Sequence, residues 1–183
     1  MRRMVYISLI AAAVVIAVIC SCASGYSDEQ ERDTGAIVEQ TIVPEVSYFD
    51  KAVEIIKKYE TLHKPAHWPL VGYGHKVLPG EKFNRRKTLS ETEADALLRK
   101  DLLKNCAVFR EFGKDSLLLG VLAYNIGSGN VKRSSVVRKL KSGNRDILDN
   151  YLSHCRYRGK PHKMIRQRRV EEFDNLYISD KKE

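Results

Sequence analysis

The sequence predicts an α+β fold that is mainly helical, with one small β-hairpin in its N-terminal part. Apolar residues recur at helical spacing in six segments, and a serine followed by an acidic residue precedes each of the first two. Between these two segments, a stretch rich in glycine and proline contains a short β-prone run. The chain has 183 residues, of which 43% are hydrophobic and 30% charged, so a disordered protein and a polytopic membrane protein are both excluded.

The first 45 residues are expected to lie outside the folded domain. Residues 1–25 are typical of an export signal, because two arginines precede an uncharged apolar run that ends in small residues. Cys22 lies in a segment that resembles a bacterial lipobox, so lipidation and membrane anchoring are expected there; ordinary secretion and an uncleaved anchor are the alternatives. Residues 26–45 are acidic and lack an apolar period, which indicates a solvated tether. The folded domain is therefore expected over residues 46–183.

Capping residues and helix breakers predict where the helices begin and end. Ser47 and Ser90 each precede an acidic residue three positions later, which favours a helix start at both places. The segment 117–126 is apolar nearly all round, which is typical of a central buried helix. The segment 70–78 is short and β-prone, which predicts the hairpin. Helices are expected over residues 48–62, 90–112, 117–126, 134–143, 146–157 and 162–177.

The net charge is spread unevenly along the chain. It is +9 in total; the first 22 residues contribute +2 and residues 23–45 contribute −5, which leaves +12 on residues 46–183. A compact domain with this excess is expected to bind a polyanion, which could be nucleic acid, an anionic membrane surface or an anionic cell-wall polymer. The export signal and the lack of a recognition motif argue against nucleic acid.

Cys106 and Cys155 are the cysteines of the expected domain. Both lie in apolar helical patterns, where a buried thiol is the ordinary outcome; a disulfide between them is the alternative in an oxidising compartment. Neither has the spacing of metal ligands, and the sequence contains no Walker loop, no GxGxxG and no GxSxG motif. Neither a metal nor another cofactor is therefore predicted.

Glu60 is the main candidate for a catalytic residue. It falls in the last turn of the first expected helix, just before an irregular segment that contains proline and histidine. The negative end of the helix dipole favours the protonated form of a carboxyl group there, which suits a general acid. The alternative is a solvated surface glutamate.

Five segments resemble, in the same order, parts of the phage-type lysozyme family of endolysins and muramidases. The resemblance covers residues 48–177. It implies a two-lobed, mainly helical lysozyme-like fold with the hairpin in the N-terminal lobe. It also implies a cleft that hydrolyses the bond between N-acetylmuramic acid and N-acetylglucosamine. The segments are 55–60 (IIKKYE), 71–75 (VGYGH), 89–102 (LSETEADALLRKDL), 123–129 (AYNIGSG) with Ser134 and Ser135, and 166–171 (RQRRVE).

The resemblance places Glu60 at the position of the family's proton-donating glutamate. Glycoside cleavage needs a carboxylic acid at the leaving oxygen, and a helix end between two lobes can provide partial desolvation. Arg166 falls where a family arginine approaches that glutamate. An arginine there would favour the ionised carboxylate and oppose the effect of the helix end.

Four further residues receive expected roles from the same resemblance. His75 and Asp101 correspond to an ion pair between the hairpin and the long helix, which would contribute to stability. Asn125 and Ser135 fall where polar groups of the family line the cleft and bind substrate. Polar residues near helix ends are more often caps, so capping is the alternative for both.

The sequence departs from the family at the second catalytic group. The family usually places an Asp or Cys and then a Thr between its glutamate and the hairpin, where they hold the attacking water. Here residues 61–71 contain no acid, and Leu70 stands at the threonine position. Three explanations remain open. A neutral imidazole of His63 or His67 orients the water, or Glu60 works alone as in lytic transglycosylases, or the domain only binds glycan.

His67 is favoured over His63 as the second catalytic group, because Trp68 beside it offers a flat apolar face to a sugar ring. Trp68 and Tyr73 are the aromatic candidates for substrate binding. Packing of Trp68 against its own lobe is the alternative for that residue.

The sequence therefore predicts an exported peptidoglycan hydrolase, a muramidase that acts as a monomer without a cofactor. It is expected in the periplasm or anchored at the membrane, facing the cell wall. The alternatives are a non-catalytic module that binds cell-wall glycan and a single-acid enzyme similar to lytic transglycosylases. A nucleic-acid-binding domain is a third possibility that the basic last helix raises.

Overall fold

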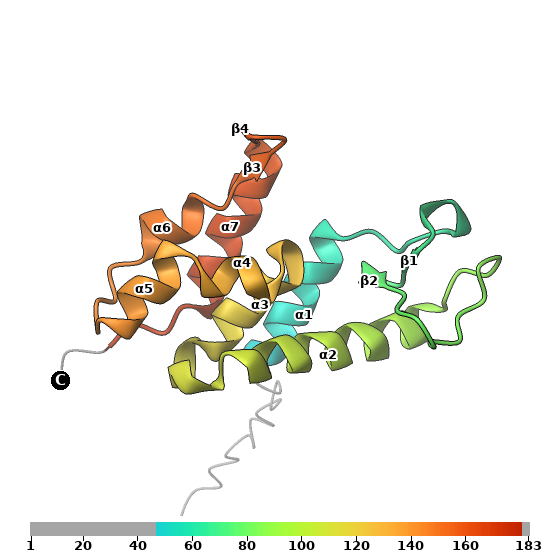
Figure 1. Cartoon of the computed structure of the whole chain (residues 1–183), viewed down its shortest axis with the longest axis horizontal. Helices are drawn as coiled ribbons and strands as arrows, with labels where there is room; N and C mark the ends of the chain where they lie inside the picture. Colours follow the sequence, from blue (N-terminus) through green and yellow to red (C-terminus); the bar gives the residue numbers. More distant parts are fainter. Residues whose placement is uncertain (1–46, 181–183) are drawn as a thin grey trace, which may run out of the picture. The chain divides into compact units, whose positions relative to one another are not determined.

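The structure, a computed structural model, describes residues 47–180, which form a mainly helical unit with two small sheets (Figure 1). The expected export signal, Cys22 and the tether lie outside the described residues. Within the described range, no helix is long and apolar enough to cross a membrane. The α-helices are α1 (Tyr48–Tyr59), α2 (Glu91–Val108), α3 (Ser116–Ile126), α4 (Ser128–Lys132), α5 (Ser135–Lys141), α6 (Leu148–Leu152) and α7 (Lys163–Leu176), and the 3₁₀ helices are η1 (Pro65–His67) and η2 (Arg110–Asp115).

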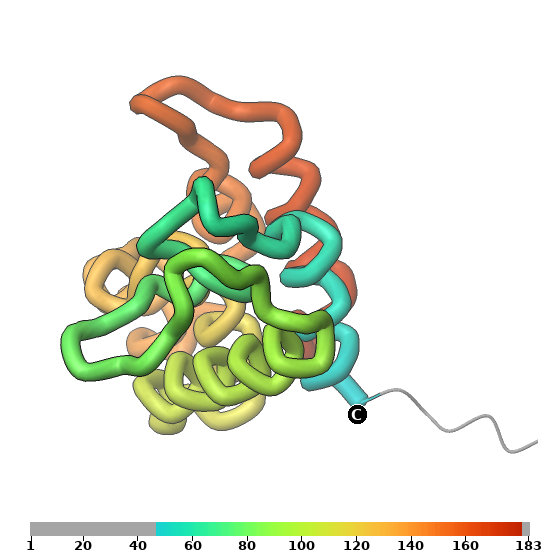
Figure 2. The backbone as a smooth tube through the Cα atoms, turned by 90° about the vertical axis from the view of Figure 1, so that its right-hand side faces the viewer, coloured from blue at the N-terminus to red at the C-terminus, as the bar shows by residue number. Residues whose placement is uncertain are grey.

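Two antiparallel strand pairs accompany the helices. Strand β1 (Leu70–Val71) pairs with β2 (His75–Lys76), which places Val71 opposite His75 and confirms the predicted hairpin. Strand β3 (Arg156–Tyr157) pairs with β4 (Lys160–Pro161) in a second hairpin that the sequence did not predict. The tube in Figure 2 shows the β3–β4 segment reaching beyond the start of α7.

Capping residues start the first two predicted helices as the sequence indicates. Ser47 Oγ accepts a hydrogen bond from Asp50 N at 3.1 Å. Ser90 Oγ accepts one from Glu93 N at 3.3 Å, and Ser90 N in return donates to Glu93 Oε2 at 2.8 Å. The reciprocal pair is a capping box, so it satisfies backbone donors that the first turn of a helix leaves free.

Several helix ends differ from the prediction. Helix α1 ends at Tyr59, three residues earlier than expected, because Glu60 is extended (φ −104°, ψ 108°). The chain then turns toward the hairpin, where His63 N donates to Gly72 O at 2.8 Å. Helix α2 ends at Val108, and the chain continues as η2, in which Gly113 has a positive φ of 53°.

The predicted helix over 146–157 is wrong beyond residue 152, where α6 ends. Arg158 and Gly159 both take positive φ, 49° and 80°, and this conformation reverses the chain into the β3–β4 hairpin. Helix α4 was also not predicted, since five residues are too few to show a helical apolar period.

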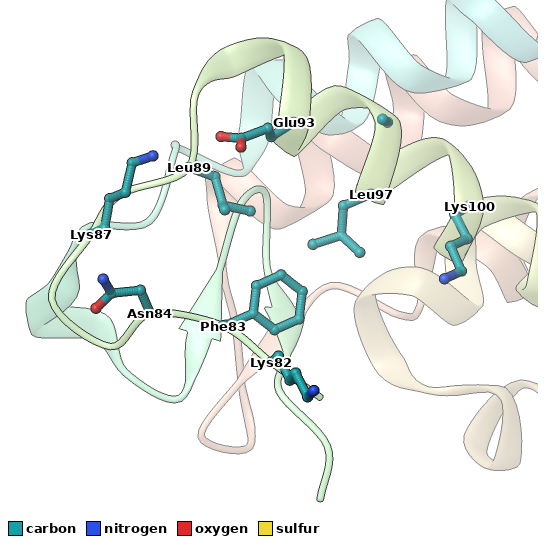
Figure 3. Close-up of a pocket in the computed structure, with 9 residues that line it drawn as sticks. Lys82, Phe83, Asn84, Lys87, Leu89, Glu93, Leu97 and Lys100 are labelled. Atoms are coloured by element: carbon teal, nitrogen blue, oxygen red, sulfur yellow. The ribbon is translucent and has the colours of Figure 1, made fainter. Parts of the chain in front are cut away.

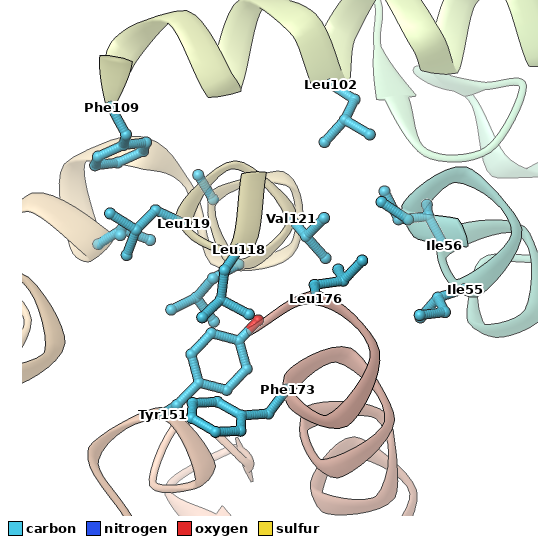
Figure 4. Close-up of a cluster of buried hydrophobic side chains, with 14 of the residues drawn as sticks. Ile55, Ile56, Leu102, Phe109, Leu118, Leu119, Val121, Tyr151, Phe173 and Leu176 are labelled. Atoms are coloured by element: carbon cyan, nitrogen blue, oxygen red, sulfur yellow. The ribbon is translucent and has the colours of Figure 1, made fainter. Parts of the chain in front are cut away.

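Helix α3 is the centre of the hydrophobic core, as its apolar sequence predicts (Figure 4). Leu118, Leu119 and Leu122 on this helix are fully buried. Helix α2 packs against α3 so closely that a Cβ added to Gly120 would lie 2.5 Å from Cys106 Sγ. Helices α1 and α7 also contact each other, which brings the end of α1 next to the basic last helix.

Both cysteines of the domain are free thiols rather than a disulfide. Cys155 is buried and Cys106 is half-buried between helices. Burial raises the pKa of the Cys106 thiol to about 11, so this side chain stays protonated near neutral pH.

Candidate active site

Glu60 stands directly after the last turn of α1, and the burial of that helix fixes its position. Val53 and Ile56 are fully buried, and Glu60 N donates to Ile56 O at 2.8 Å. The Glu60 side chain is 24% exposed. It is therefore partly shielded and differs from the solvated surface glutamate that was the alternative.

Arg168 on α7 holds one oxygen of this carboxylate. Its Nη1 lies 2.7 Å from Glu60 Oε1, and its Nε lies 2.8 Å from Oε1 of Glu172, one turn along the helix. Burial alone would lower the pKa of Arg168, but the charge of Glu172 and the hydrogen bond to Glu60 outweigh burial and raise it. Arg168 is thus a permanent cation that fixes the direction of the Glu60 carboxylate.

The prediction that Arg166 approaches Glu60 is wrong. Arg166 is exposed, whereas Arg168 is buried and makes the contact. Two positions along an α-helix correspond to a rotation of about 200°, so the two side chains leave α7 on nearly opposite faces. Leu176 is the apolar residue whose position in the sequence indicates the inward face of α7. It lies about two turns after Arg168 and is buried, so both side chains share that face.

A buried polar network lies behind this ion pair. Arg169 Nη2 donates to Asn125 Oδ1 at 3.0 Å, and Arg169 Nη1 lies 3.0 Å from Glu172 Oε2. Tyr151 Oη donates to the same Glu172 oxygen at 2.8 Å. Arg169 and Glu172 are fully buried. Glu60 and Glu172 together carry the two negative charges that balance the guanidinium groups of Arg168 and Arg169.

Asn125 connects this network to the candidate acid. Its Nδ2 lies 3.5 Å from Glu60 Oε1, the outer limit of a hydrogen bond. Asn125 is exposed at the end of α3, next to the glutamate. The geometry therefore brings Asn125 to the candidate site, where a substrate role stays a prediction.

The other oxygen of Glu60 faces the β1–β2 turn. A Cβ added to Gly74 would lie 3.9 Å from Glu60 Oε2 and 4.0 Å from Tyr124 Cε1, so the turn leaves space beside the carboxylate. Tyr124 Oη donates to Tyr73 O at 2.8 Å and ties α3 to the turn. Gly74 and Tyr124 also line a cavity of about 270 Å³ between β2, α2 and α3. Glu60 does not itself line this cavity, but Gly74, beside its Oε2, does.

A second cavity, of about 480 Å³, lies between the segment 82–89 and α2 (Figure 3). Neither Glu60 nor another predicted site residue lines it, so its size does not make it the candidate active site. Its lining combines apolar side chains with lysines, chiefly Phe83, Leu89, Leu97, Lys82, Lys87 and Lys100.

The prediction that Tyr73 binds substrate through its side chain is wrong. Tyr73 is 8% exposed and belongs to the hydrophobic core. Gly72 and Gly74 on either side have positive φ, 56° and 102°, and the tight turn they form leaves the tyrosine ring in the core. Lys57 Nζ lies over this ring, 5.8 Å from its centroid.

The two histidines after α1 differ in their hydrogen bonds. His67 Nδ1 accepts from Lys64 N at 3.1 Å, so this nitrogen carries no proton and its lone pair is engaged. His63 Nδ1 lies 3.0 Å from Thr61 O and 3.2 Å from Gly72 O. Two carbonyl acceptors require a proton on His63 Nδ1, which leaves the Nε2 lone pair of a neutral His63 unused by these contacts.

Trp68 is half-buried beside the two histidines. It lines a small enclosed cavity with His63, Leu70 and Arg85. The rings of His63 and His67 meet edge to face at 5.0 Å. Packing within its own lobe, the alternative role of Trp68, matches this position more closely than an open sugar-binding face.

The predicted contact between His75 and Asp101 is confirmed. His75 Nδ1 lies 2.5 Å from Asp101 Oδ2, and His75 Nε2 lies 2.8 Å from Glu81 Oε2, a partner that was not predicted. Burial alone would lower the pKa of His75, but hydrogen bonds and charges from Glu81 and Asp101 outweigh burial and raise it above the usual 6.5.

The raised pKa predicts a pH-dependent contribution of His75 to stability. The native state binds this proton more tightly than the unfolded chain, so the contribution is complete below about pH 6.5 and declines as the pH rises through the native pKa. In His75→Gln, the free energy of unfolding should therefore fall less than in the wild type between about pH 6 and pH 8.5. Urea denaturation at several pH values in this range measures the free energy of unfolding. His162→Gln is the control, because His162 is exposed. Parallel profiles for His75→Gln and wild type would contradict the assignment.

Ser135 has a partner outside the surroundings of Glu60. Its Oγ accepts a hydrogen bond from Asn150 Nδ2 at 2.9 Å, which connects the start of α5 to α6. No contact in the described part of the chain connects it with Glu60, so its substrate role stays a prediction. Among residues 47–180, no group of three or more His, Cys, Asp or Glu side chains could hold a metal ion.

Comparison with known proteins agrees with this geometry. No individual curated protein matches the chain significantly. A sequence model described as phage lysozyme matches residues 57–172, more than half of the chain. The match includes Glu60, the hairpin, α2 and the part of α7 that carries Arg168. The chain therefore belongs to the phage lysozyme family, and its activity is that of a peptidoglycan-cleaving enzyme of the lysozyme type.

Proposed function

We propose that the protein is an N-acetylmuramidase, which hydrolyses the bond between N-acetylmuramic acid and N-acetylglucosamine with Glu60 as general acid. One observation carries the proposal. Glu60 Oε1 is held by Arg168 Nη1 at 2.7 Å, while its Oε2 lies near Gly74, a residue that lines the 270 Å³ cavity. A carboxyl group with one oxygen fixed by an arginine and the other directed toward the β1–β2 turn can present its proton in a defined direction.

The proton of the neutral Glu60 carboxyl passes to the bridging oxygen as the glycosidic bond breaks, and positive charge develops on the sugar ring. A bound glycan strand excludes water from the partly exposed side chain, so that the proton passes directly from the carboxyl group to the bridging oxygen. After transfer, Arg168 stabilises the resulting carboxylate through the ion pair described above. Water then supplies a hydroxyl group to the sugar and a proton that restores Glu60.

For the residue that orients this water, the hydrogen bonds favour His63 over His67. A water-orienting base needs a lone pair, and the Nδ1 lone pair of His67 is already engaged with Lys64 N. We expect His63→Ala to lower kcat by about 10²-fold if the imidazole acts as a base, and His67→Ala to change it much less. Rates of muropeptide release measure both. Equal and small effects of the two changes would leave Glu60 as the sole catalytic residue.

Product analysis separates the muramidase from a transglycosylase. Hydrolysis adds one water to each broken bond and leaves reducing N-acetylmuramic acid, whereas attack by the muramyl C6 hydroxyl leaves a 1,6-anhydro sugar. The two products therefore differ in mass by one water. We expect the reducing product in the mass spectrum of digested peptidoglycan, and a predominance of anhydro product would overturn the hydrolytic proposal.

We further propose that the protein is exported, acts as a monomer and is attached to the membrane through Cys22, facing the wall. The proposals of export and anchoring rest on residues 1–25, and the wall as partner rests on the charge of the domain. Incorporation of labelled palmitate into the wild type but not into Cys22→Ser would support the anchor. Equal labelling of both, or labelling of neither, would contradict it.

A further inference from the structure

Tyr59 is the last residue of α1 and directly precedes Glu60. Its side chain is half-buried and contacts α7, the helix that carries Arg168 and Glu171. The Tyr59 hydroxyl donates a hydrogen bond to Glu171 Oε2 at 2.8 Å. The guanidinium carbon of Arg168 lies 5.7 Å from the centroid of the Tyr59 ring, within the range of a cation–π contact. One side chain therefore contacts both the cation that holds Glu60 and a neighbouring acid.

Glu171 is an acid that could compete with Glu60 for Arg168. It lies three positions after Arg168 on α7, and residues at this spacing are neighbours on the surface of a helix. Burial alone would raise the pKa of Glu171, but hydrogen bonds from Lys58 and Tyr59 outweigh burial and lower it, so the side chain is a carboxylate near neutral pH. Arg168 nevertheless pairs with Glu60, and the described part of the chain contains no ion pair between Arg168 and Glu171.

Two side chains at the end of α1 engage Glu171 instead. Lys58 Nζ lies 2.7 Å from each of its carboxylate oxygens, and the Tyr59 hydroxyl supplies the third contact. The Lys58 side chain is 58% exposed, and an exposed ion pair of this kind contributes little. Burial, and then the hydrogen bond to Glu171, raises the pKa of Tyr59 to about 12, so its hydroxyl remains a donor near neutral pH. Tyr59 is therefore the better fixed of the two contacts.

We propose that Tyr59 is a positioning residue that keeps Arg168 on the carboxylate of Glu60. Its ring engages the guanidinium group of Arg168 while its hydroxyl engages Glu171, so that these two side chains do not pair. An aromatic ring attracts a guanidinium group and leaves its N–H donors available to other partners. Arg168 Nη1 thus remains free to hold Glu60 Oε1 at 2.7 Å. The inference rests on the proposed function, in which Arg168 directs the catalytic carboxyl group.

Kinetics of two Tyr59 variants test this role. Tyr59→Leu retains an apolar side chain without the ring or the hydroxyl. It should lower kcat on peptidoglycan by at least about tenfold and change KM much less, because a misdirected acid affects the transition state rather than binding. Tyr59→Phe keeps the ring, and Lys58 still pairs with Glu171, so its kcat should stay within about threefold of the wild type. An unchanged kcat in Tyr59→Leu, an effect on KM alone, or equal losses in both variants would overturn the proposal.

The double variant Tyr59→Leu/Glu171→Gln tests the competition between the two acids. Glutamine at position 171 has nearly the shape of glutamate but no charge, so it cannot draw Arg168 away from Glu60. We expect its kcat to be at least about threefold higher than that of Tyr59→Leu, a non-additive effect that residues in one network show. A double variant as slow as Tyr59→Leu would exclude Glu171 as the competitor and overturn the proposal.

Tyr177→Leu is the matched control for a general loss of stability. Tyr177 is likewise a half-buried tyrosine, its ring centroid lies 5.2 Å from the guanidinium carbon of Arg145, and its hydroxyl donates to Arg145 O at 2.8 Å. None of these contacts involves Glu60. Tyr177→Leu should therefore lower the unfolding midpoint about as much as Tyr59→Leu does, but leave kcat unchanged. An equal decrease of kcat in both variants would attribute the effect to loosening of the fold and overturn the proposal.

Crystal structures of the wild type and Tyr59→Leu test the arrangement without any catalytic step. We expect Arg168 at ion-pair distance from Glu171 in the variant and from Glu60 in the wild type. Arg168 that still contacts Glu60 and not Glu171 in Tyr59→Leu would overturn the proposal. A wild type without activity on peptidoglycan would refute the proposed function, while the two structures would still decide whether Tyr59 determines the partner of Arg168.

Discussion

Replacing Glu60 with glutamine should reduce the lysis of a peptidoglycan suspension by at least about 10³-fold, near the upper range for loss of a general acid. Glutamine has nearly the shape of glutamate and retains an oxygen that Arg168 can contact, but it has no proton of sufficient acidity to donate. The decrease should appear in kcat, because the proton is transferred in the transition state.

Glu60→Gln should still fold, because Glu172 continues to pair with Arg168 at 2.8 Å, but its free energy of unfolding should be lower, since one of the two countercharges of the interior arginines is lost. Circular dichroism and the unfolding midpoint of Glu60→Gln, compared with those of the wild type, show whether the variant is folded. Glu54→Gln is the matched control, since Glu54 is a 67% exposed glutamate on the same helix whose pair with Lys57 contributes little. Equal loss of turbidity with wild type and Glu60→Gln would remove the catalytic assignment and favour a module that binds cell-wall glycan.

Replacing Gly120 with alanine should be strongly destabilising, by about 2 to 4 kcal/mol in the free energy of unfolding. The added Cβ would lie 2.5 Å from Cys106 Sγ and 3.0 Å from Cys106 N. Part of this obstacle is backbone of α2, so rotation of one side chain cannot remove it. The higher helix propensity of alanine, about 1 kcal/mol, offsets only part of the cost.

Urea denaturation measures this effect, and two further variants test its cause. Gly129 is also helical, but a Cβ there meets only Arg133 Nη1, at 3.7 Å, so Gly129→Ala should be neutral or slightly stabilising. Adding Cys106→Ala to Gly120→Ala should restore part of the loss, because it removes the sulfur but leaves the backbone contact. Similar stabilities of Gly120→Ala and Gly129→Ala would disprove the close approach of α2 and α3.

Elements with strong local signals could be predicted from the sequence. Ser47 and Ser90 start their helices because each cap forms within four residues and needs no tertiary contact. The apolar run of α3 likewise predicts burial by composition alone. The β3–β4 hairpin could not be predicted, because Arg158 adopts a left-handed conformation that arginine does not favour by itself.

The candidate site could be predicted only in part. The resemblance gave Glu60 and the contact between His75 and Asp101, both of which depend on position along the chain. It did not give Arg168, because which arginine faces inward depends on the rotation of α7 set by the core. The prediction that the Tyr73 side chain binds substrate was wrong for a related reason, since only the folded turn determines on which side the ring lies.

The pairing of Glu60 with Arg168 also bears on how this enzyme can change over evolutionary time. Because two interior cations depend on two acids, substitution of Glu60 removes a countercharge as well as a proton donor. Selection for folding alone would then preserve the acid in descendants that no longer cut the wall. Loss of activity in such a lineage is expected first in the residues that admit the strand, with the glutamate among the last to disappear.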